Sequence, residues 1–339
     1  MSNEIILDVK NMCTSFISEK RETKIVKNVS FQLKKGTCLA IVGESGCGKS
    51  VTVNSAVQLM PKNAHVTADH IIYRSYKTGE MKEYRLDKLK KYGKEMRSLR
   101  GPEIGMIFQD PMASLNPVYK IKTQIAEGLI EHERLKKKEA MPRVLEMLKK
   151  LGIPAAEQRM EDYPHQMSGG MKQRIIIAIA MICDPEVIIA DEPTTALDVT
   201  IQAQIMELMK QLQTDFGKSI ILITHNMGLV AEMANEIIVM YMGRIVEFGK
   251  IEEIFEHPKH PYTEALLKSV PVLGMEEGAV LVTIPGSTPS PAELGDGCEF
   301  ADRCQYCMDK CRKKDIPNFE VEPGHKVRCL KYDTYPEVD

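Results

Sequence analysis

The stretch GESGCGKS, residues 43–50, combines glycines with a lysine and a serine at a spacing that can bind phosphate. It fits G-x-x-x-x-G-K-[ST], and it lies between an apolar run typical of a strand and a segment typical of a helix. Glycines let the backbone N–H groups turn toward phosphate oxygens, and the helix presents its positive end. Lys49 can reach the β- and γ-phosphates, and Ser50 can ligate Mg²⁺. The predicted nucleotide-binding residues are Gly43, Glu44, Ser45, Gly46, Cys47, Gly48, Lys49, Ser50 and Val51.

Two adjacent acids end the apolar run VIIADEP and can supply the hydrolytic chemistry. Asp191 suits a direct or indirect contact to Mg²⁺, and Glu192 suits polarisation of a water for in-line attack on the γ-phosphate. Taken alone, two acids after a strand also fit a helix cap. The phosphate loop upstream favours the catalytic interpretation.

Other polar residues lie where this chemistry can use them. Gln109 in FQDP can sense Mg²⁺ or the attacking water, and His225 at the end of IILITH can contact the γ-phosphate. Either one alone also fits a plain loop or capping residue. Ser168, Gly169 and Gly170 open a helix in MSGGMKQR and form a second anion-binding helix end. One phosphate loop does not need a second such end.

The motifs GESGCGKS, FQDP, SGGMKQR, VIIADEPTTALD and ITHN follow one another in the order and spacing of the ATPase subunits of ABC transporters. The chain resembles that family from about Ile5 to Gly249, although Met167 and Met171 replace the Leu and Gln of many members. The resemblance implies that two subunits pack head to tail, so that Ser168, Gly169 and Gly170 of one contact the ATP held by the other. It also places residues 196–198, with Asp198, at that interface. ATP then closes the dimer and hydrolysis reopens it.

Strands alternating with helices predict a mostly parallel α/β sheet, and a helical pattern runs from about Tyr119 to Leu151. We expect a P-loop ABC-type ATPase domain over residues 1–262, with a helical subdomain at about 112–168 that touches the transport channel. A small, loop-rich, Cys-containing extension is expected over residues 263–339. Adenine stacks on an early aromatic residue in this family, and Phe16 is the candidate here, against an ordinary packed Phe.

Segments outside the core motifs resemble ATPases of oligopeptide and dipeptide importers. They are RGPEIGMIFQDPMASLNPVY, DYPHQMSGGMKQR, HPKHPYTEALLKSVP and IPGSTPSPAELGDGCEFADRC. The resemblance implies ATP and Mg²⁺ as cofactors, and as partners a second ATPase subunit (a paralogue or a second copy), two membrane permeases and an extracytoplasmic substrate-binding protein. Nickel and sugar importers share this ATPase type and stay open as alternatives. So do a non-transport ABC ATPase and a module that binds ATP without turnover, although intact Glu192 and His225 weigh against the latter.

The composition of the chain limits the partners and the cellular location that we expect. A net charge of −2 argues against a basic nucleic-acid-binding surface, so no nucleic-acid partner is expected. The start of the chain lacks a secretory signal, and the longest apolar run, IIIAIAMIC, is too short to span a membrane. We therefore expect a peripheral protein at the cytoplasmic face of the membrane, bound through its permeases.

Five cysteines gather near the end of the chain, four of them within CEFADRCQYCMDKC. In a reducing compartment such clusters bind metal more often than they form disulfides. Relatives with this extension share the spacing of Cys298, Cys304, Cys311 and Cys329, which suits a [4Fe–4S] cluster or, alternatively, Zn²⁺. Cys307 departs from the pattern and could replace Cys298 or Cys311. We expect this short, loop-rich extension to bury little core, so a metal would hold it together.

Overall fold

The computed structural model describes residues 4–18, 21–195, 197–269, 284–291 and 294–338, which divide into two units by their packing. The first unit is formed by Met1–Leu7, Leu33–Cys38 and Ile72–Ile223. The second is formed by Asp8–Gln32, Leu39–Ile71 and Thr224–Asp339. The predicted domain limits at residues 112, 168 and 262 stay predictions, because the units follow packing density rather than chain order.

The first unit contains a parallel sheet of three buried strands, β7 (Ile104–Ile107), β8 (Val187–Asp191) and β9 (Ser219–Ile223). In register, Ile107 lies opposite Ala190, and Asp191 lies opposite Ile223. Parallel neighbours need a crossover, and helices supply it between each pair of strands. The parallel α/β arrangement predicted from the alternating pattern is therefore confirmed here.

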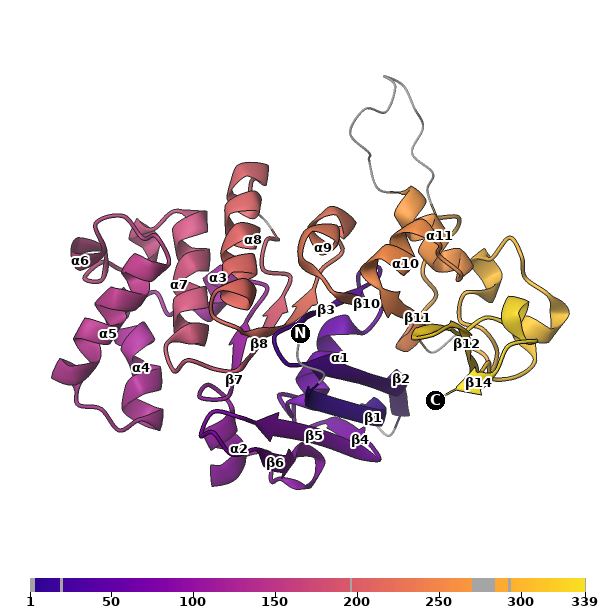
Figure 1. Ribbon diagram of the computed structural model, residues 1–339, viewed down its shortest axis with the longest axis horizontal. Coiled ribbons are helices and arrows are strands. Elements are labelled where there is room, and N and C mark those ends of the chain that lie inside the picture. The colour runs from indigo at the N-terminus through magenta and orange to yellow at the C-terminus, as the bar shows by residue number, and fades with distance from the viewer. Residues whose placement is uncertain (1–3, 19–20, 196, 270–283, 292–293, 339) are drawn as a thin grey trace, which may run out of the picture. The chain divides into compact units, whose positions relative to one another are not determined.

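Helices fill the long crossover between β7 and β8, and α4, α5 and α7 lie side by side in Figure 1. Buried Leu129 of α4 and Leu148 of α5 are typical of the apolar faces that pack in this group. The helical pattern predicted from Tyr119 to Leu151 is interrupted at Arg134, whose φ of 60° ends one helix before the next begins. The elements are α3 (Pro111–Ser114), α4 (Ile121–His132), α5 (Lys137–Lys150), α6 (Ala156–Arg159), η2 (Pro164–Gln166) and α7 (Gly169–Met181).

The remaining elements of the first unit precede β7 in the chain, except α8, which connects β8 to β9. The hairpin β5–β6 is antiparallel, with Tyr73 opposite Tyr84. Tyr73 is fully buried, and its hydroxyl bonds Glu103 just before β7. These elements are β5 (His70–Ser75), β6 (Lys82–Arg85), η1 (Leu86–Lys88), α2 (Lys94–Leu99) and α8 (Val199–Thr214).

The second unit is built around β3 (Cys38–Val42) and its parallel neighbour β10 (Glu236–Tyr241). An antiparallel partner, β11 (Arg244–Lys250), follows β10 after a tight turn at Gly243 with φ 82°. A Cβ on Gly243 would lie 1.9 Å from the carbonyl oxygen of Ile25, so the turn requires glycine. Other elements here are β1 (Ile5–Ser18), β2 (Arg21–Lys34), α1 (Lys49–Ala56), β4 (Ala64–Thr67) and α9 (Met227–Met233).

The C-terminal extension adds strands to β11 in this unit. β13 pairs antiparallel with β11, with Glu247 opposite Val327, and β12 and β14 continue outward. The pattern of the sequence did not predict these strands, because they are short and lie between turns. The elements are α10 (Ile251–Glu256), α11 (Pro261–Lys268), η3 (Ala301–Arg303), η4 (Asp309–Arg312), β12 (Asn318–Glu322), β13 (His325–Val327), η5 (Leu330–Tyr332) and β14 (Glu337–Val338).

The extension also has an apolar core of its own, which corrects the expectation that it could bury little. Its buried members are Cys311, Ile316, Phe319, Val327 and Leu330. Part of the extension, residues 270–283 and 292–293, lies outside the described residues.

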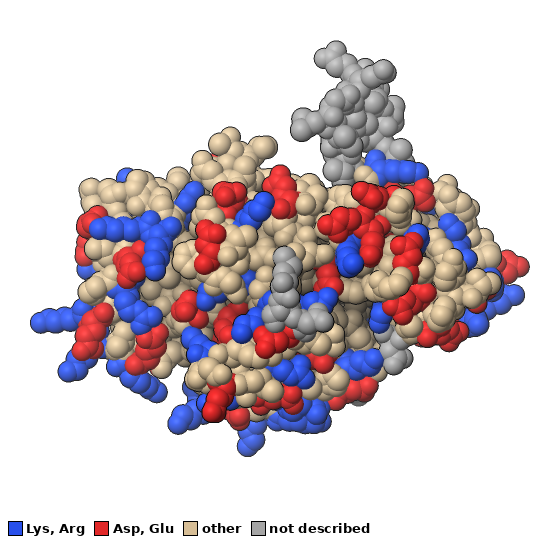
Figure 2. All heavy atoms as spheres, in the orientation of Figure 1, with Lys and Arg blue, Asp and Glu red and all other residues tan. Residues whose placement is uncertain are grey.

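The surface carries mixed charge. On the face drawn in Figure 2, Lys and Arg side chains alternate with Asp and Glu side chains. Among the residues that the structure describes, no helix is long and apolar enough to cross a membrane.

The contact between β7 and α7 gives the first testable prediction. A Cβ on Gly105 would lie 2.5 Å from the carbonyl oxygen of Ala180, so Gly105→Ala should lower the free energy of unfolding by about 1–3 kcal/mol. Gly295→Ala is the control, because nothing lies within 4 Å of its added Cβ. Chemical denaturation measures both variants, and equal stability of the two would contradict the close packing of α7 on β7.

Candidate active site

The loop GESGCGKS leaves the fully buried strand β3 and leads into α1. Gly43 has φ 151°, and a Cβ there would lie 2.2 Å from the carbonyl oxygen of Met240. Gly46 and Gly48 have φ 78° and 103°, in the left-handed half of conformational space that side chains disfavour. Ser45 and Gly46 are exposed at the apex. The glycine spacing therefore produces a curled, open-topped loop ahead of a helix N-terminus, which is a geometry that can accept an anion.

Lys49 and Cys47 hold the loop from inside. The buried Lys49 ammonium donates to the carbonyl oxygens of Gly43, at 2.8 Å, and Glu44, at 3.0 Å. The Cys47 carbonyl accepts from the Gly243 N–H at 2.8 Å, which ties the loop to the β10–β11 turn. Burial raises the pKa of the Cys47 thiol, so it is a neutral spacer, as a small buried residue in this position should be. Ser50 and Val51, at the start of α1, are half-buried.

Gln109, Asp191 and Glu192 belong to the first unit, where the carboxyl ends of β7 and β8 meet at one sheet edge. Gln109 Nε2 donates to Glu192 Oε2 at 3.0 Å, and Thr195 Oγ1 donates to the same oxygen at 2.9 Å. Asp191 is the buried last residue of β8. The structure therefore brings Gln109 to Glu192 across 83 positions of sequence.

The Glu192 backbone is unusual. Its φ is 47°, a value that non-glycine residues rarely adopt, and its N–H donates to the Ile223 carbonyl oxygen at 2.9 Å. This bond lies at the end of β9 and fixes the turn that aims the carboxylate. A carboxylate held by two donors in a strained turn is fixed in direction, as a group that orients water needs to be.

Ser168 and Asp198 begin two helices of the first unit. Ser168 caps α7 by accepting from the Met171 N–H, and Asp198 caps α8 by accepting from the Ile201 N–H at 3.0 Å. Ser168 and Gly169 are exposed, whereas Gly170 is buried. A Cβ on Gly170 would lie 2.8 Å from a methyl carbon of Ile201, so this glycine also serves the packing of α7 on α8. Ala196 lies outside the described residues.

His225 and Phe16 lie in the second unit. His225 is exposed between Thr224, whose N–H bonds the Ile41 oxygen of β3, and Asn226, which caps α9. The bond of Thr224 places this segment beside the carboxyl end of β3, the strand that leads into the phosphate loop. Phe16 is half-buried on β1 opposite Ala64 of β4, so its assignment to adenine stays a prediction.

Comparison with known families decides the identity. A model described as ABC transporter matches residues 26–195, and one described as oligopeptide/dipeptide transporter, C-terminal region, matches residues 246–311. The dipeptide transport ATP-binding protein DppD of Lactococcus lactis is 47% identical over 98% of this chain and 93% of its own. The chain belongs to the ABC transporter ATPases. Oligopeptide transport ATP-binding protein AppD of Bacillus subtilis is 46% identical, over 97% of both chains.

Solved structures agree with this ABC ATPase fold. An ATP-binding cassette in a dimeric post-hydrolysis state, bound to ADP and Pi, has a TM-score of 0.60 and 28% identity. The match covers 72% of this chain and 98% of that cassette. The predicted fold class and the ATP-hydrolysing activity are therefore confirmed.

The five tail cysteines of this ABC ATPase line one small cavity of about 20 Å³, together with apolar side chains such as Phe300 and Leu330. Burial raises the pKa of Cys298 to about 12 and of Cys329 to about 11, so both thiols are protonated at neutral pH. Cysteine sulfurs are suitable ligands for zinc or iron, and all five belong to the lining of this one cavity. Nevertheless, within the described part of the chain no group of three or more His, Cys, Asp or Glu side chains is arranged to hold a metal ion. The structure thus gives the predicted iron–sulfur or zinc site no direct support.

Two residues that contact the phosphate loop were not predicted from the sequence. The Glu44 N–H donates to the hydroxyl of Tyr262 at 2.8 Å, and the Glu44 carboxylate pairs with Arg303. Tyr262 and Arg303 lie in segments that the sequence analysis used only for their resemblance to peptide importers. No local pattern signals a partner more than 200 positions away in the chain.

Proposed function

We propose that this ABC ATPase powers the import of oligopeptides or dipeptides. The observation that carries the proposal is the match of residues 246–311 to the C-terminal region of oligopeptide/dipeptide transporters, beside full-length relatives named for dipeptide and oligopeptide transport. The extension that makes this match lies against the phosphate loop through Arg303 and Glu44. A nickel or sugar importer would share the ATPase chemistry but has no such support here.

In the proposed mechanism the loop of residues 43–51 binds the phosphates of Mg²⁺–ATP. Lys49 would turn from the loop carbonyl oxygens to the β- and γ-phosphates, and Ser50 and Asp191 would hold the Mg²⁺. Glu192 polarises the attacking water, and Gln109, hydrogen-bonded to Glu192, senses the occupancy of the site. His225 contacts the γ-phosphate, and Phe16 stacks on adenine.

The proposed partner across the ATP is a second ATPase subunit. Ser168, Gly169 and Asp198 are exposed at two helix starts of the first unit, and Val199 beside Asp198 is 81% exposed. These exposed helix starts are accessible to the phosphates of ATP bound by another subunit. ATP held by one subunit would then meet the α7 start of the other, and hydrolysis would release it.

The proposed membrane partners are two permeases, fed by an extracytoplasmic substrate-binding protein. Exposed apolar side chains follow Gln109 in the chain, with Val118 71% and Tyr119 54% exposed just before α4. Such residues suit a docking surface for a permease, because a partner would cover them. Docking there would hold the protein at the cytoplasmic face of the membrane and place Gln109 between the partner and Glu192.

We also propose that the tail cysteines bind a metal, with a [4Fe–4S] cluster favoured over Zn²⁺. Support comes from five cysteines that line one small cavity, of which Cys311 is buried and the other four are half-buried. Cys298, Cys304, Cys311 and Cys329 would be the ligands, since a metal favours the thiolate that burial alone disfavours. Its role would be structural, added to the apolar core that the extension already has.

The role proposed for Glu192 predicts that its substitution lowers the rate of ATP hydrolysis without weakening ATP binding. Glu192→Gln keeps the donors Gln109 and Thr195 supplied with an acceptor but removes the base, so ATP turnover should fall roughly 100-fold or more with ATP affinity retained. Glu207→Gln on the exposed face of α8 is the matched control. Steady-state ATPase assays of the assembled transporter measure both. Near-normal turnover by Glu192→Gln would refute the role of Glu192.

The cargo is tested in cells that lack this gene. Uptake of labelled dipeptides and oligopeptides should be lost, restored by the wild-type chain, and not restored by Glu192→Gln. Peptide uptake that is unaffected by the deletion would contradict the peptide assignment and leave nickel or sugar as the cargo.

The metal proposal is tested by elemental analysis and visible absorption of anaerobically purified protein. We expect a brown protein with iron, retained in Cys307→Ser and in Cys13→Ser but lost in Cys329→Ser. Zinc in place of iron would identify the alternative metal. Absence of both metals from the wild-type protein would overturn the proposal.

A further inference from the structure

Glu44, the second residue of the phosphate loop, is held by a side chain from the distant C-terminal extension. Arg303 Nη1 lies 2.6 Å from Glu44 Oε2, and Arg303 Nη2 lies 3.0 Å from Glu44 Oε1. This paired geometry is the strongest form of ion pair between such groups. The Arg303 side chain is 6% exposed and that of Glu44 is 23% exposed, so solvent screens the pair only in part.

The backbone of Glu44 is fixed from the same side. Its N–H donates to the hydroxyl of Tyr262, a fully buried residue of α11. The Tyr262 ring packs on Tyr241 at 4.7 Å and on Phe300 at 5.4 Å between ring centroids. The Tyr241 hydroxyl in turn accepts from Arg303 at 3.2 Å. The backbone amide and the carboxylate of Glu44 therefore bind two members of one packed group, Tyr262 and Arg303.

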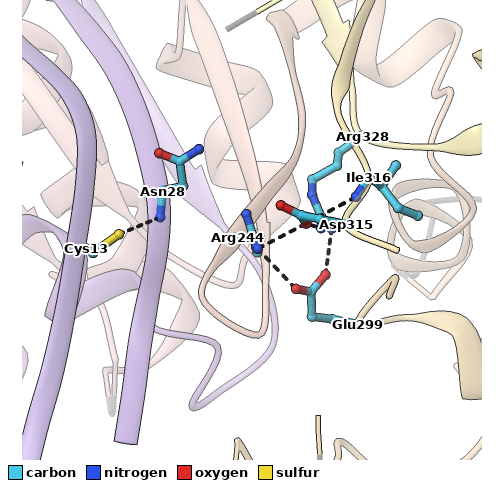
Figure 3. Close-up of polar contacts among 7 residues, drawn as sticks. All are labelled: Cys13, Asn28, Arg244, Glu299, Asp315, Ile316 and Arg328. Carbon is cyan, nitrogen blue, oxygen red and sulfur yellow. Dashed lines mark hydrogen bonds and ion pairs between the residues drawn. The ribbon is translucent and has the colours of Figure 1, made fainter. Parts of the chain in front are cut away.

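The segment that carries Arg303 is itself anchored. Glu299 accepts from Arg244 at 3.2 Å and from Arg328 at 2.6 Å, and Asp315 pairs with both arginines, as Figure 3 shows. In addition, Arg303 Nε donates to the Pro285 carbonyl oxygen at 2.8 Å.

The β10–β11 turn gives the extension a second connection to the loop. Arg244 directly follows Gly243, whose N–H donates to the Cys47 carbonyl oxygen in the loop. The extension is therefore linked to the loop both at Glu44 and through this turn.

Charge explains why this contact should matter to nucleotide binding. A carboxylate at the second loop position adds a negative charge where phosphates are to bind, and an unpaired one would repel them. Arg303 offsets this charge and holds the carboxylate on the extension side. We propose that Arg303 is a positioning residue for the phosphate loop, so that ATP affinity depends on the C-terminal extension. The inference rests on the phosphate-binding role proposed above for residues 43–51.

The test is Mg²⁺–ADP binding by calorimetry with the full-length chain. Arg303→Met leaves Glu44 charged and unpaired, and its affinity should fall roughly tenfold, the size expected for loss of a hydrogen bond to a charged group. Glu44→Gln/Arg303→Met removes the repelling charge as well, so its affinity should return to within about threefold of wild type. Arg312→Met is the matched control, because Arg312 pairs with Asp302 at the surface of the same extension. Its affinity should equal that of wild type.

A purely structural role for Arg303 predicts a different pattern. The melting temperature would fall in both Arg303→Met and the double variant, and the second substitution would not restore affinity. That result, or Arg303→Met binding within about twofold of wild type, would overturn the inference. If Arg303→Met does not fold, Arg303→Gln decides, since it removes the positive charge and keeps a polar side chain. Weaker binding by Arg303→Gln supports the inference, and unchanged binding contradicts it.

Two further measurements separate this inference from the proposed function. Lys49→Ala should lose ADP binding altogether. If Lys49→Ala binds ADP normally, the assignment of residues 43–51 to phosphate binding is wrong. If Lys49→Ala loses ADP binding but Arg303→Met binds ADP normally, only the inference about Arg303 is wrong. In the assembled transporter, Arg303→Met should raise the KM for ATP and leave kcat at saturating ATP near that of wild type.

Discussion

The backbone at Gly43 is the constraint on which the second unit depends. There is no space for a Cβ at this position, because the carbonyl oxygen of Met240 on β10 would lie 2.2 Å from it. The parallel pairing of β10 with β3 therefore determines where the phosphate loop starts. From that point the loop is enclosed by the β10–β11 turn, which bonds Cys47, and by the extension, which bonds Glu44. Its exposed apex at Ser45 and Gly46 remains open to a ligand.

In the first unit the carboxylate of Glu192 is also fixed in direction. Glu192 adopts a φ of 47° and is kept there by the Ile223 carbonyl, with its carboxylate bound by Gln109 and Thr195. Strain of this kind costs about 1–3 kcal/mol, and the surrounding hydrogen bonds must offset it. For the general base that we propose, this arrangement sets the direction of the carboxylate before the substrate binds. Because Gln109 follows β7 and precedes the helices, a movement of those helices would reach Glu192 through one hydrogen bond.

The sequence was sufficient for the parts of the site that rest on local patterns. The glycine spacing of residues 43–50 predicted a curled loop, and the acids after VIIA predicted a carboxylate at the end of β8, as observed. The pattern also predicted that Ser168 opens a helix. Each of these depends on neighbours within one strand–turn–helix segment, where residue type and spacing determine the backbone.

Contacts between distant segments could not be predicted in this way. Arg303 and Glu44 are 259 positions apart, and either one taken alone resembles a solvated surface charge. The strands β12 and β13 have only five and three residues and lie between turns, so their pattern does not stand out from the loops around them. Pairing with β11 and the small core around Phe319 stabilise them. The expectation that the extension buries little core was wrong, because its apolar residues come together only through the tertiary packing around Phe319. The cysteine spacing identified side chains that share a cavity, but it did not determine the arrangement of their sulfur atoms.

The central claim is that the C-terminal extension holds the phosphate loop before nucleotide binds. Amide hydrogen exchange of the nucleotide-free, full-length protein tests it most directly, by comparing residues 43–50 in wild type and in Arg303→Met. The account predicts faster exchange across this loop in the variant, with unchanged exchange in α7 of the first unit. Equal exchange of the loop in both proteins would contradict it.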